Sequence, residues 1–499
     1  MNAMKKLLAI ALGMFAVSAM ADVTLDGPTF ITSNTTVSEK VTGSGYYVVQ
    51  NGATLTLSGE GNDFTGGVII SNGVLKAQSS GAFGTGSITY EGTAAQRTVQ
   101  LDAANGSFPN AFTIKDAGTT SDNPAIYLTK SASIGKDIVL DQSMPSVSAA
   151  YIYLKVGASS SDTGVQLTAN GETLAGGGRI FVTGWGKVDF VKRVTTSDMR
   201  LGNAYSEHGA VTLRSPDNEI ARLVQAHFDV ECTADYVLDR TSYQLNFNKA
   251  WGHAGYATMK LNGTRQNFQY ANCGSDCDID FSEDEKWGEM FYNNNNQRVS
   301  TITFNADGLT SASGICVNRF YGNMNIVMEN KFAQDTGTYY QAFQGRDNSG
   351  MVGNISIGNR CQFRVFNGCR FGGVTNLTVE SGGFITYENR SGKTTPVGRT
   401  FTGLQTLTLK GTAFIRTDYA DTVEPVNSPK ANLYMDADSR IYLSEGVTMT
   451  VKKLYIDGEL MAAGEYTSEN LPQMKNTNVK YNGGVLKVLR GPGSMILVR

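Results

Sequence analysis

The sequence predicts an all-β protein built as a parallel β-helix, because one short strand pattern recurs, glycine is abundant and charged residues are few. The pattern spans four residues and has apolar side chains at its second and fourth positions. Six copies start 22 to 30 residues apart, at Thr301, Asn325, Asn354, Asn376, Thr406 and Asn432. Repeats of this length are typical of solenoids, in which one unit buries its apolar face only against a stacked neighbour.

The composition agrees with this fold class. A chain of 499 residues is too long for one compact core of ordinary size, whereas a solenoid grows by adding units that contact only their neighbours. Charged residues make up 17% of the chain and there are 56 glycines. The net charge of −3 lacks the basic excess that nucleic-acid binding needs. We therefore expect no nucleic-acid partner.

The first 21 residues are predicted to be a signal peptide. Lys5 and Lys6 precede a short apolar run, and an Ala-x-Ala cleavage site ends at Ala21. The apolar run is too short to cross a bilayer, and no later segment has the length of a transmembrane helix. We expect a mature chain that begins at Asp22 and is periplasmic, surface-bound or secreted.

Residues 54–90 contain four motifs in a fixed order: an LTLSG strand, a TGG turn, a GVL strand and an AFGTG turn. This stretch resembles the passenger-associated repeat of autotransporter proteins. The resemblance covers one copy, and it implies a right-handed β-helix in an exported, surface-associated protein. It departs from that family at the C-terminus, where the residues after the last repeat are too few for a membrane barrel of eight or more strands.

A Phe-x-Gly element stands before several copies of the strand pattern. Glycine at a fixed offset is expected in a turn with positive φ, and phenylalanine at a fixed offset is expected to stack inside the coil. The residues concerned are Phe320, Phe371, Phe401, Gly322, Gly373 and Gly403.

Asparagine opens four of the six copies, at Asn325, Asn354, Asn376 and Asn432. Stacked strands place equivalent residues about 4.8 Å apart, a spacing at which side-chain amides can form a hydrogen-bonded ladder. A structural role is expected for these residues.

The strand rhythm divides the mature chain into four parts. Residues 22–130 form an N-terminal β-helix with the passenger-type repeat, and residues 131–300 continue it with lateral loop insertions. Residues 301–445 form the regular coils, and residues 446–499 form a C-terminal β cap over the last open edge. Two separate β domains are the alternative for the middle part.

The densest acidic segment contains Asp276, Asp278 and Asp280, beside Cys273 and Cys277. Alternating carboxylates suit Ca²⁺, which prefers six to eight oxygen ligands. The spacing does not fit an EF-hand, because Phe281 occupies the glycine position. A solvated acidic loop is the alternative. The six cysteines allow disulfides in an exported chain, and buried free thiols are the alternative.

Aromatic residues gather near the same segment, at Trp251, Trp287, Phe291 and Tyr292. Exposed rings are good platforms for sugar faces, so these four are candidate glycan-stacking residues. Packing in the core is the alternative.

No catalytic signature is present: the chain has three histidines and lacks H-E-x-x-H, G-x-S-x-G and phosphate-binding loops. The sequence therefore predicts a non-catalytic exported protein acting in surface structure, adhesion or extracellular interaction, without a cofactor unless Ca²⁺ binds. A β-helix polysaccharide lyase or glycoside hydrolase is one alternative, and a non-catalytic glycan-binding module is another.

Overall fold

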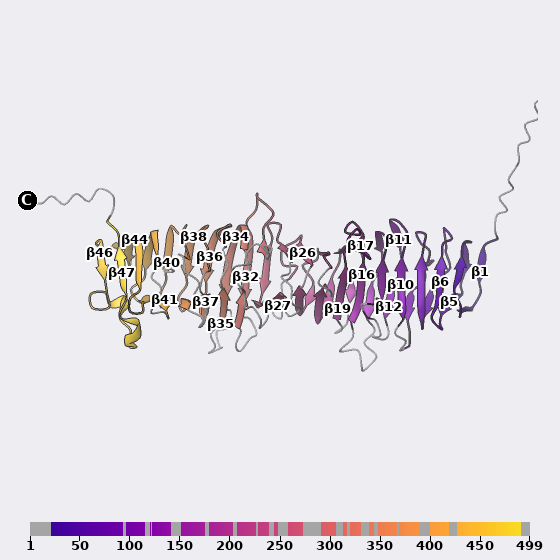
Figure 1. Cartoon of the computed structure of the whole chain (residues 1–499), viewed down its shortest axis with the longest axis horizontal. Helices are drawn as coiled ribbons and strands as arrows, with labels where there is room; N and C mark the ends of the chain where they lie inside the picture. The colour runs from indigo at the N-terminus through magenta and orange to yellow at the C-terminus, as the bar shows by residue number, and fades with distance from the viewer. Residues whose placement is uncertain are drawn as a thin grey trace, which may run out of the picture.

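The computed structural model describes most of the chain as one elongated stack of strands, with the first strands at one end and the last strands at the other (Figure 1). The described residues are 21–92, 96–114, 120, 122–140, 151–174, 179–202, 207–225, 228–238, 244–247, 258–272, 291–305, 313–316, 320–330, 339–343, 348–366, 369–388, 400–418 and 427–490. The predicted signal peptide up to residue 20 therefore lies outside them.

Four long sheets carry nearly all of the described strands, and we name each by its place or size. The N-terminal sheet has eleven parallel strands: β3 (Thr35–Val37), β6 (Ala53–Leu57), β8 (Gly73–Ala77), β10 (Arg97–Leu101), β13 (Ile126–Leu128), β16 (Tyr151–Val156), β19 (Arg179–Gly184), β22 (Asp198–Leu201), β25 (Arg222–Gln225), β27 (Gln244–Phe247) and β30 (Tyr270–Asn272). The nine-stranded sheet contains β2 (Pro28–Ile31), β5 (Tyr46–Val49), β7 (Val68–Ile70), β9 (Ile88–Tyr90), β12 (Phe112–Ile114), β15 (Ile138–Leu140), β18 (Thr173–Leu174), β21 (Val194–Thr196) and β24 (Glu219–Ile220).

The long sheet has nineteen strands: β11 (Gly106–Phe108), β14 (Ala132–Ile134), β17 (Gln166–Ala169), β20 (Lys187–Phe190), β23 (Ala210–Leu213), β26 (Asp229–Cys232), β28 (Met259–Lys260), β29 (Arg265–Phe268), β31 (Phe291–Tyr292), β32 (Ser300–Asn305), β34 (Phe320–Glu329), β36 (Met351–Ile357), β38 (Val374–Val379), β40 (Thr406–Leu409), β42 (Ser428–Met435), β44 (Thr448–Ile456), β45 (Glu459–Leu460), β46 (Gly464–Tyr466) and β47 (Val485–Val488). The six-stranded sheet contains β33 (Ser313–Cys316), β35 (Tyr339–Phe343), β37 (Cys361–Phe366), β39 (Phe384–Glu388), β41 (Phe414–Thr417) and β43 (Arg440–Tyr442). A short pair, β1 (Val23–Leu25) and β4 (Val41–Gly43), stands apart.

The path of the chain between the sheets is regular. From β10 to β24, successive strands join the N-terminal, the long and the nine-stranded sheet in turn. Each strand therefore pairs in parallel with the third strand along the chain, as β10 does with β13, β11 with β14 and β12 with β15. After β31 the chain alternates between the long sheet and the six-stranded sheet. The all-β class and the long parallel sheets predicted from the sequence are confirmed.

The six copies of the strand pattern stack in register on the long sheet. The first residues pair in the order Thr301, Asn325, Asn354, Asn376, Thr406 and Asn432. The second and fourth residues of every copy are buried, as Ile355 and Ile357 illustrate. Alternation in a strand sends successive side chains to opposite faces, so one face of each copy fills the core and the other faces outward.

The phenylalanines of the Phe-x-Gly element stack in the core. Phe320, Phe371 and Phe401 are each at most 1% exposed. Phe371 lies with its ring centroid 6.2 Å from that of Phe320 and 5.8 Å from that of Phe401. Rings at these separations pack favourably edge to face or offset.

The glycines of the same element have two different roles. Gly322 has a φ of +91°, the left-handed conformation that was expected. Gly373 and Gly403 lie in turns where space is short: an added Cβ would fall 2.2 Å from the Met351 carbonyl oxygen and 2.0 Å from that of Gly372. The expectation of a positive φ at these two positions is wrong. Glycine is required there because backbone atoms approach too closely to leave room for a Cβ.

The asparagines that open the copies are joined over three strands. The Asn376 amide donates to Asn354 Oδ1 at 2.7 Å, and the Asn354 amide donates to Asn325 Oδ1 at 3.2 Å. Thr406 follows in the next strand, so the run of amides stops before Asn432. All four asparagines occupy strand positions, and the side chains of Asn325, Asn354 and Asn376 join neighbouring strands.

The far end of the long sheet differs in strand direction. β45 pairs antiparallel with β44, and β46 pairs antiparallel with β47, whose other neighbour is β44 in parallel. Two short 3₁₀ helices, η3 (Pro472–Met474) and η4 (Val479–Tyr481), lie between β46 and β47. The segment predicted to be a cap thus folds back on the final strands.

Two cysteines lie in the core. Cys232 and Cys361 are buried free thiols, and burial raises the pKa of Cys361 to about 12.

In the described part of the chain, no helix has the length and apolar character needed to span a membrane.

Candidate functional site

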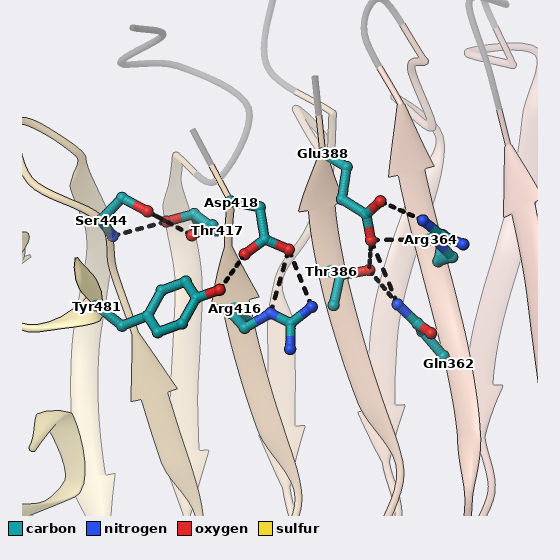
Figure 2. Close-up of polar contacts among 9 residues, drawn as sticks. All are labelled: Gln362, Arg364, Thr386, Glu388, Arg416, Thr417, Asp418, Ser444 and Tyr481. Carbon is teal, nitrogen blue, oxygen red and sulfur yellow. Dashed lines mark hydrogen bonds and ion pairs between the residues drawn. The ribbon is translucent and has the colours of Figure 1, made fainter. Parts of the chain in front are cut away.

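A group of connected polar contacts lies on the outer face of the six-stranded sheet (Figure 2). In β39, Ile385 and Tyr387 are buried in the core, so the alternating residues Thr386 and Glu388 lie on the opposite face. The register pairs Thr386 with Arg364 on one side and with Arg416 on the other. We call Gln362, Arg364, Thr386, Glu388, Arg416, Asp418 and Tyr481 the C-terminal polar cluster.

Glu388 is held by three side chains from two strands. Arg364 donates from Nε to Oε1 at 3.0 Å and from a second guanidinium nitrogen to Oε2. The Thr386 hydroxyl donates to Oε1 at 2.9 Å and accepts from the Gln362 amide at 2.7 Å. A two-pronged arginine–carboxylate pair of this kind fixes both position and orientation.

The aromatic ring of Tyr340 supports this pair from the preceding strand. The guanidinium carbon of Arg364 lies 4.5 Å from the Tyr340 ring centroid. A guanidinium over a ring face is attracted by the ring quadrupole. Arg364 is therefore constrained on two sides, by a carboxylate and by an aromatic face.

Asp418 is held by Arg416, two residues earlier in the chain, and by the C-terminal segment. Arg416 donates to Oδ2 from Nε at 3.2 Å and from Nη2 at 2.9 Å. The Tyr481 hydroxyl donates to Oδ1 at 2.5 Å. Burial raises the pKa of Tyr481, and the hydrogen bond and the negative charge of Asp418 raise it further. Tyr481 therefore ties η4 to the sheet in its protonated form.

Thr417 and Ser444 fix the backbone from which Asp418 projects. Both are buried and lie beneath the outer face. The Ser444 hydroxyl donates to the Thr417 carbonyl oxygen at 2.5 Å, and the Ser444 N–H donates to the Thr417 hydroxyl oxygen at 2.9 Å. Figure 2 shows this pair beside the Asp418 contacts.

A short aromatic row borders the polar cluster on the same outer face. The rings of Phe384 and Phe414 are stacked at 4.5 Å with an interplanar angle of 10°. Tyr442 follows on β43 at 5.7 Å from Phe414. All three side chains are partly exposed. Partly exposed rings offer flat apolar surface beside the ordered guanidinium and amide groups of the cluster.

The arrangement suits binding better than proton transfer. A general acid or a nucleophile needs a carboxyl group that can approach the substrate. Here Glu388 and Asp418 each accept two or more hydrogen bonds from arginine, and each also accepts from a hydroxyl group.

The residues predicted from the sequence to stack on a glycan lie in different surroundings. Phe291 is fully buried and stacks on Phe320 at 5.1 Å, so its expected surface role is corrected to a core role. Tyr292 is half-buried and packs against the exposed Tyr321 at 5.7 Å. The predicted residues Trp251, Trp287, Asp276, Asp278 and Asp280 lie outside the described residues.

The sequence contained a signal for the C-terminal polar cluster. Residues 384–388 and 414–418 share the pattern Phe-Ile-x-x-acid, with a separation of one repeat. The two copies pair in register, which places Glu388 beside Asp418. Arg364 has no such pattern around it, so its partnership with Glu388 follows only from the strand register.

Comparisons of the chain with models of known protein families, with curated proteins and with solved structures find no match.

Proposed function

We propose that the chain is a right-handed parallel β-helix of the autotransporter passenger-associated type. Between β10 and β24, successive strands join three sheets in a repeating order, and this order supports the proposed fold. The motifs of residues 54–90 support the family. The predicted signal peptide supports export to the periplasm, the cell surface or the medium.

We propose that a protein with this fold has a non-catalytic role in surface structure, adhesion or extracellular interaction. The observation that carries the proposal is the engagement of Glu388 and Asp418 by arginine and hydroxyl donors. Carboxylates bound in this way order the outer face of the sheet. They leave the partly exposed rings of Phe384, Phe414 and Tyr442 as a platform for a partner.

A glycoside hydrolase is the second candidate, for one reason. Glu388 is the last residue of β39, and Asp418 comes directly after the neighbouring strand β41, which pairs with β39 in register. Neighbouring strands lie about 4.8 Å apart. Retaining glycosidases place their two carboxyl groups about 5–5.5 Å apart. This candidate requires Arg364 and Arg416 to release the carboxylates when substrate binds.

Incubation with a panel of neutral and acidic polysaccharides separates the two candidates. The binding role predicts retention on a polymer without new reducing or unsaturated ends. Retention should fall in Tyr442→Ala and persist in Tyr434→Ala, a matched control from the Tyr434–Tyr455 stack on the long sheet. Chain cleavage that disappears in both Glu388→Gln and Asp418→Asn would instead establish the hydrolase.

Export is tested independently of binding. Fractionation of cells that express the full chain should place the protein outside the cytoplasm. N-terminal sequencing of the mature form should begin at Asp22. A cytoplasmic protein that keeps Met1 would refute the proposed export.

A further inference from the structure

A second group of charged and aromatic side chains lies on the outer face of the N-terminal sheet, across β16, β19, β22 and β25. The register places Tyr151 beside Arg179 and Arg179 beside Asp198. Asp198 in turn lies beside Arg222, because the following residues Met199 and Leu223 pair. We call Tyr151, Tyr153, Arg179, Phe181, Asp198, Arg200 and Arg222 the arginine patch.

Asp198 is shared by two arginines. Arg200 donates from Nε to Oδ2 at 3.2 Å, and Arg222 donates from Nε to Oδ1 at 3.2 Å and from a second nitrogen to Oδ2. The Asp198 residue is only 2% exposed, whereas about a third of each arginine side chain is exposed. The carboxylate is therefore beneath the surface and the guanidinium groups are at the surface.

Arg179 is positioned by an aromatic residue. Its Nη1 donates to the Tyr151 hydroxyl oxygen at 3.0 Å, and its guanidinium carbon lies 5.2 Å from the Tyr151 ring centroid. Arg200 lies 5.3 Å from the same ring centroid. In the part of the chain that the structure describes, Arg179 has no carboxylate partner. A guanidinium group that packs on an aromatic ring, and not on a carboxylate, keeps its full positive charge and can pair with an anionic ligand.

Rings of the patch form a small platform beside these cations. Tyr153 and Phe181 lie 4.9 Å apart with an interplanar angle of 30°, and Tyr151 lies 5.7 Å from Phe181. Phe181 is buried at 4% exposure, and both tyrosines are partly exposed. The rings therefore pack side by side on the outer face of two neighbouring strands.

We propose that the arginine patch binds an acidic polysaccharide, with uronate carboxylates on Arg179 and Arg200 and a sugar face on Tyr153. The guanidinium fork matches a carboxylate in two-pronged geometry, and a partly exposed tyrosine offers a flat apolar surface with a polar end. Successive strands repeat about every 4.8 Å along the sheet, a step of the size of one sugar ring. A linear polymer that follows the strand stack therefore advances about one strand for each sugar unit.

The charge of the whole chain favours a polysaccharide over a nucleic acid. Affinity for nucleic acids comes mainly from many phosphate contacts within a broad basic field. The chain has 42 basic and 45 acidic residues, so its positive charge here is local. The arginine patch also lies on strands other than those of the C-terminal polar cluster, so this proposal stands without a binding role for that cluster.

Isothermal titration with a galacturonate oligomer tests the proposal on the full mature chain. Arg179→Gln and Tyr153→Ala should each weaken binding at least tenfold, and Arg179→Lys should restore only part of the affinity. Arg265→Gln is the matched control, because Arg265 is an exposed arginine on β29 of the long sheet; it should bind as the unmodified protein does. Circular dichroism verifies that each variant retains its strands.

Two comparison ligands complete the test. A neutral oligomer with its carboxyl groups reduced should bind at least tenfold more weakly than the galacturonate oligomer. Equal binding of the neutral oligomer, equal loss in Arg265→Gln, or tighter binding of a single-stranded oligonucleotide would each overturn the proposal.

Discussion

The arginine patch and the C-terminal polar cluster are built on the same plan but balance their charges differently. Both occupy outward positions on adjacent parallel strands. In the cluster, Arg364 pairs with Glu388 and Arg416 pairs with Asp418, one arginine for each carboxylate. In the patch, Asp198 serves both Arg200 and Arg222.

The depth of the carboxylates differs as well. The Asp198 side chain is 3% exposed, whereas those of Glu388 and Asp418 are 15% and 20% exposed. A deeply buried carboxylate depends on its cations, because water cannot replace them. A half-buried carboxylate can turn to water when it loses one partner. Similar ion pairs on one fold should therefore differ in how strongly the carboxylate depends on each arginine.

The largest effect is expected when Asp198 loses both of its cations. Arg200→Met with Arg222→Met keeps most of the aliphatic packing and leaves a buried charge unpaired, which costs about 3–5 kcal/mol. Native-state hydrogen exchange of the Met199 and Leu201 amides in β22 measures this loss. Adding Asp198→Asn to the double variant should recover most of it. Unchanged protection in the double variant would show that Asp198 does not depend on these arginines.

A smaller effect is expected from Tyr481→Phe in the C-terminal polar cluster. The substitution removes the hydroxyl that donates to Asp418, and a hydrogen bond to a charged group contributes about 1.5–3 kcal/mol. We expect about 1–2 kcal/mol, because Asp418 keeps Arg416 and is partly hydrated. Hydrogen exchange of β47 measures the change. Tyr466→Phe, which removes an exposed hydrogen bond to the Ala462 carbonyl, should have less effect.

Alkaline pH should act on the cluster through the same tyrosine. The pKa of Tyr481 is raised in the folded state, first by burial and then by Asp418. The folded state therefore holds the proton of the Tyr481 hydroxyl more tightly than the unfolded state, in which tyrosines titrate at about pH 10. The associated stability is present below that pH and is lost as the pH rises through the folded pKa. The difference in stability between the unmodified protein and Tyr481→Phe should shrink across this range; a constant difference would contradict the assignment.

The smallest effect is expected from salt, and its sign should differ between the two regions. Salt screens the repulsion between Arg179 and Arg200, so β19 should gain protection by at most about 0.5 kcal/mol. Salt also screens the attraction between Arg364 and Glu388, so β39 should lose a similar amount. Hydrogen exchange of both strands at low and high NaCl concentration compares them. If salt changed the protection of both strands in the same direction, the proposed difference in charge balance between the two regions would be contradicted.

The core of the fold was predictable from the sequence because its signal is local. The apolar second and fourth positions of each copy, such as Leu377 and Val379, are buried in the structure. The positive φ of Gly322 also follows from local backbone preference. Gly373 and Gly403 were harder to predict, because they are required by close backbone approach from residues distant in the sequence, Met351 and Gly372.

The two outer clusters were not predicted, because each also needs a partner that strand register brings from a neighbouring strand. Arg364 and Glu388 are 24 residues apart, as are Asp198 and Arg222. Loops of different lengths separate these strands, so spacing alone does not pair them. Phe291 was misplaced for the opposite reason: an aromatic residue near a polar segment gives no sign of which face of its short strand it occupies.

The junction between the N-terminal sheet and the six-stranded sheet has a mechanical consequence. The first ends at β30 and the second begins at β33. The buried amide of Gln341 accepts from the Ala271 N–H and donates to the Ala271 carbonyl oxygen, both at 3.1 Å. A side chain thus takes the place of a backbone partner at this step, while the long sheet runs on beside it. When the protein is pulled along the long axis of the strand stack, we expect strands to separate first at this junction. The separation should begin between the N-terminal and six-stranded sheets rather than in the long sheet.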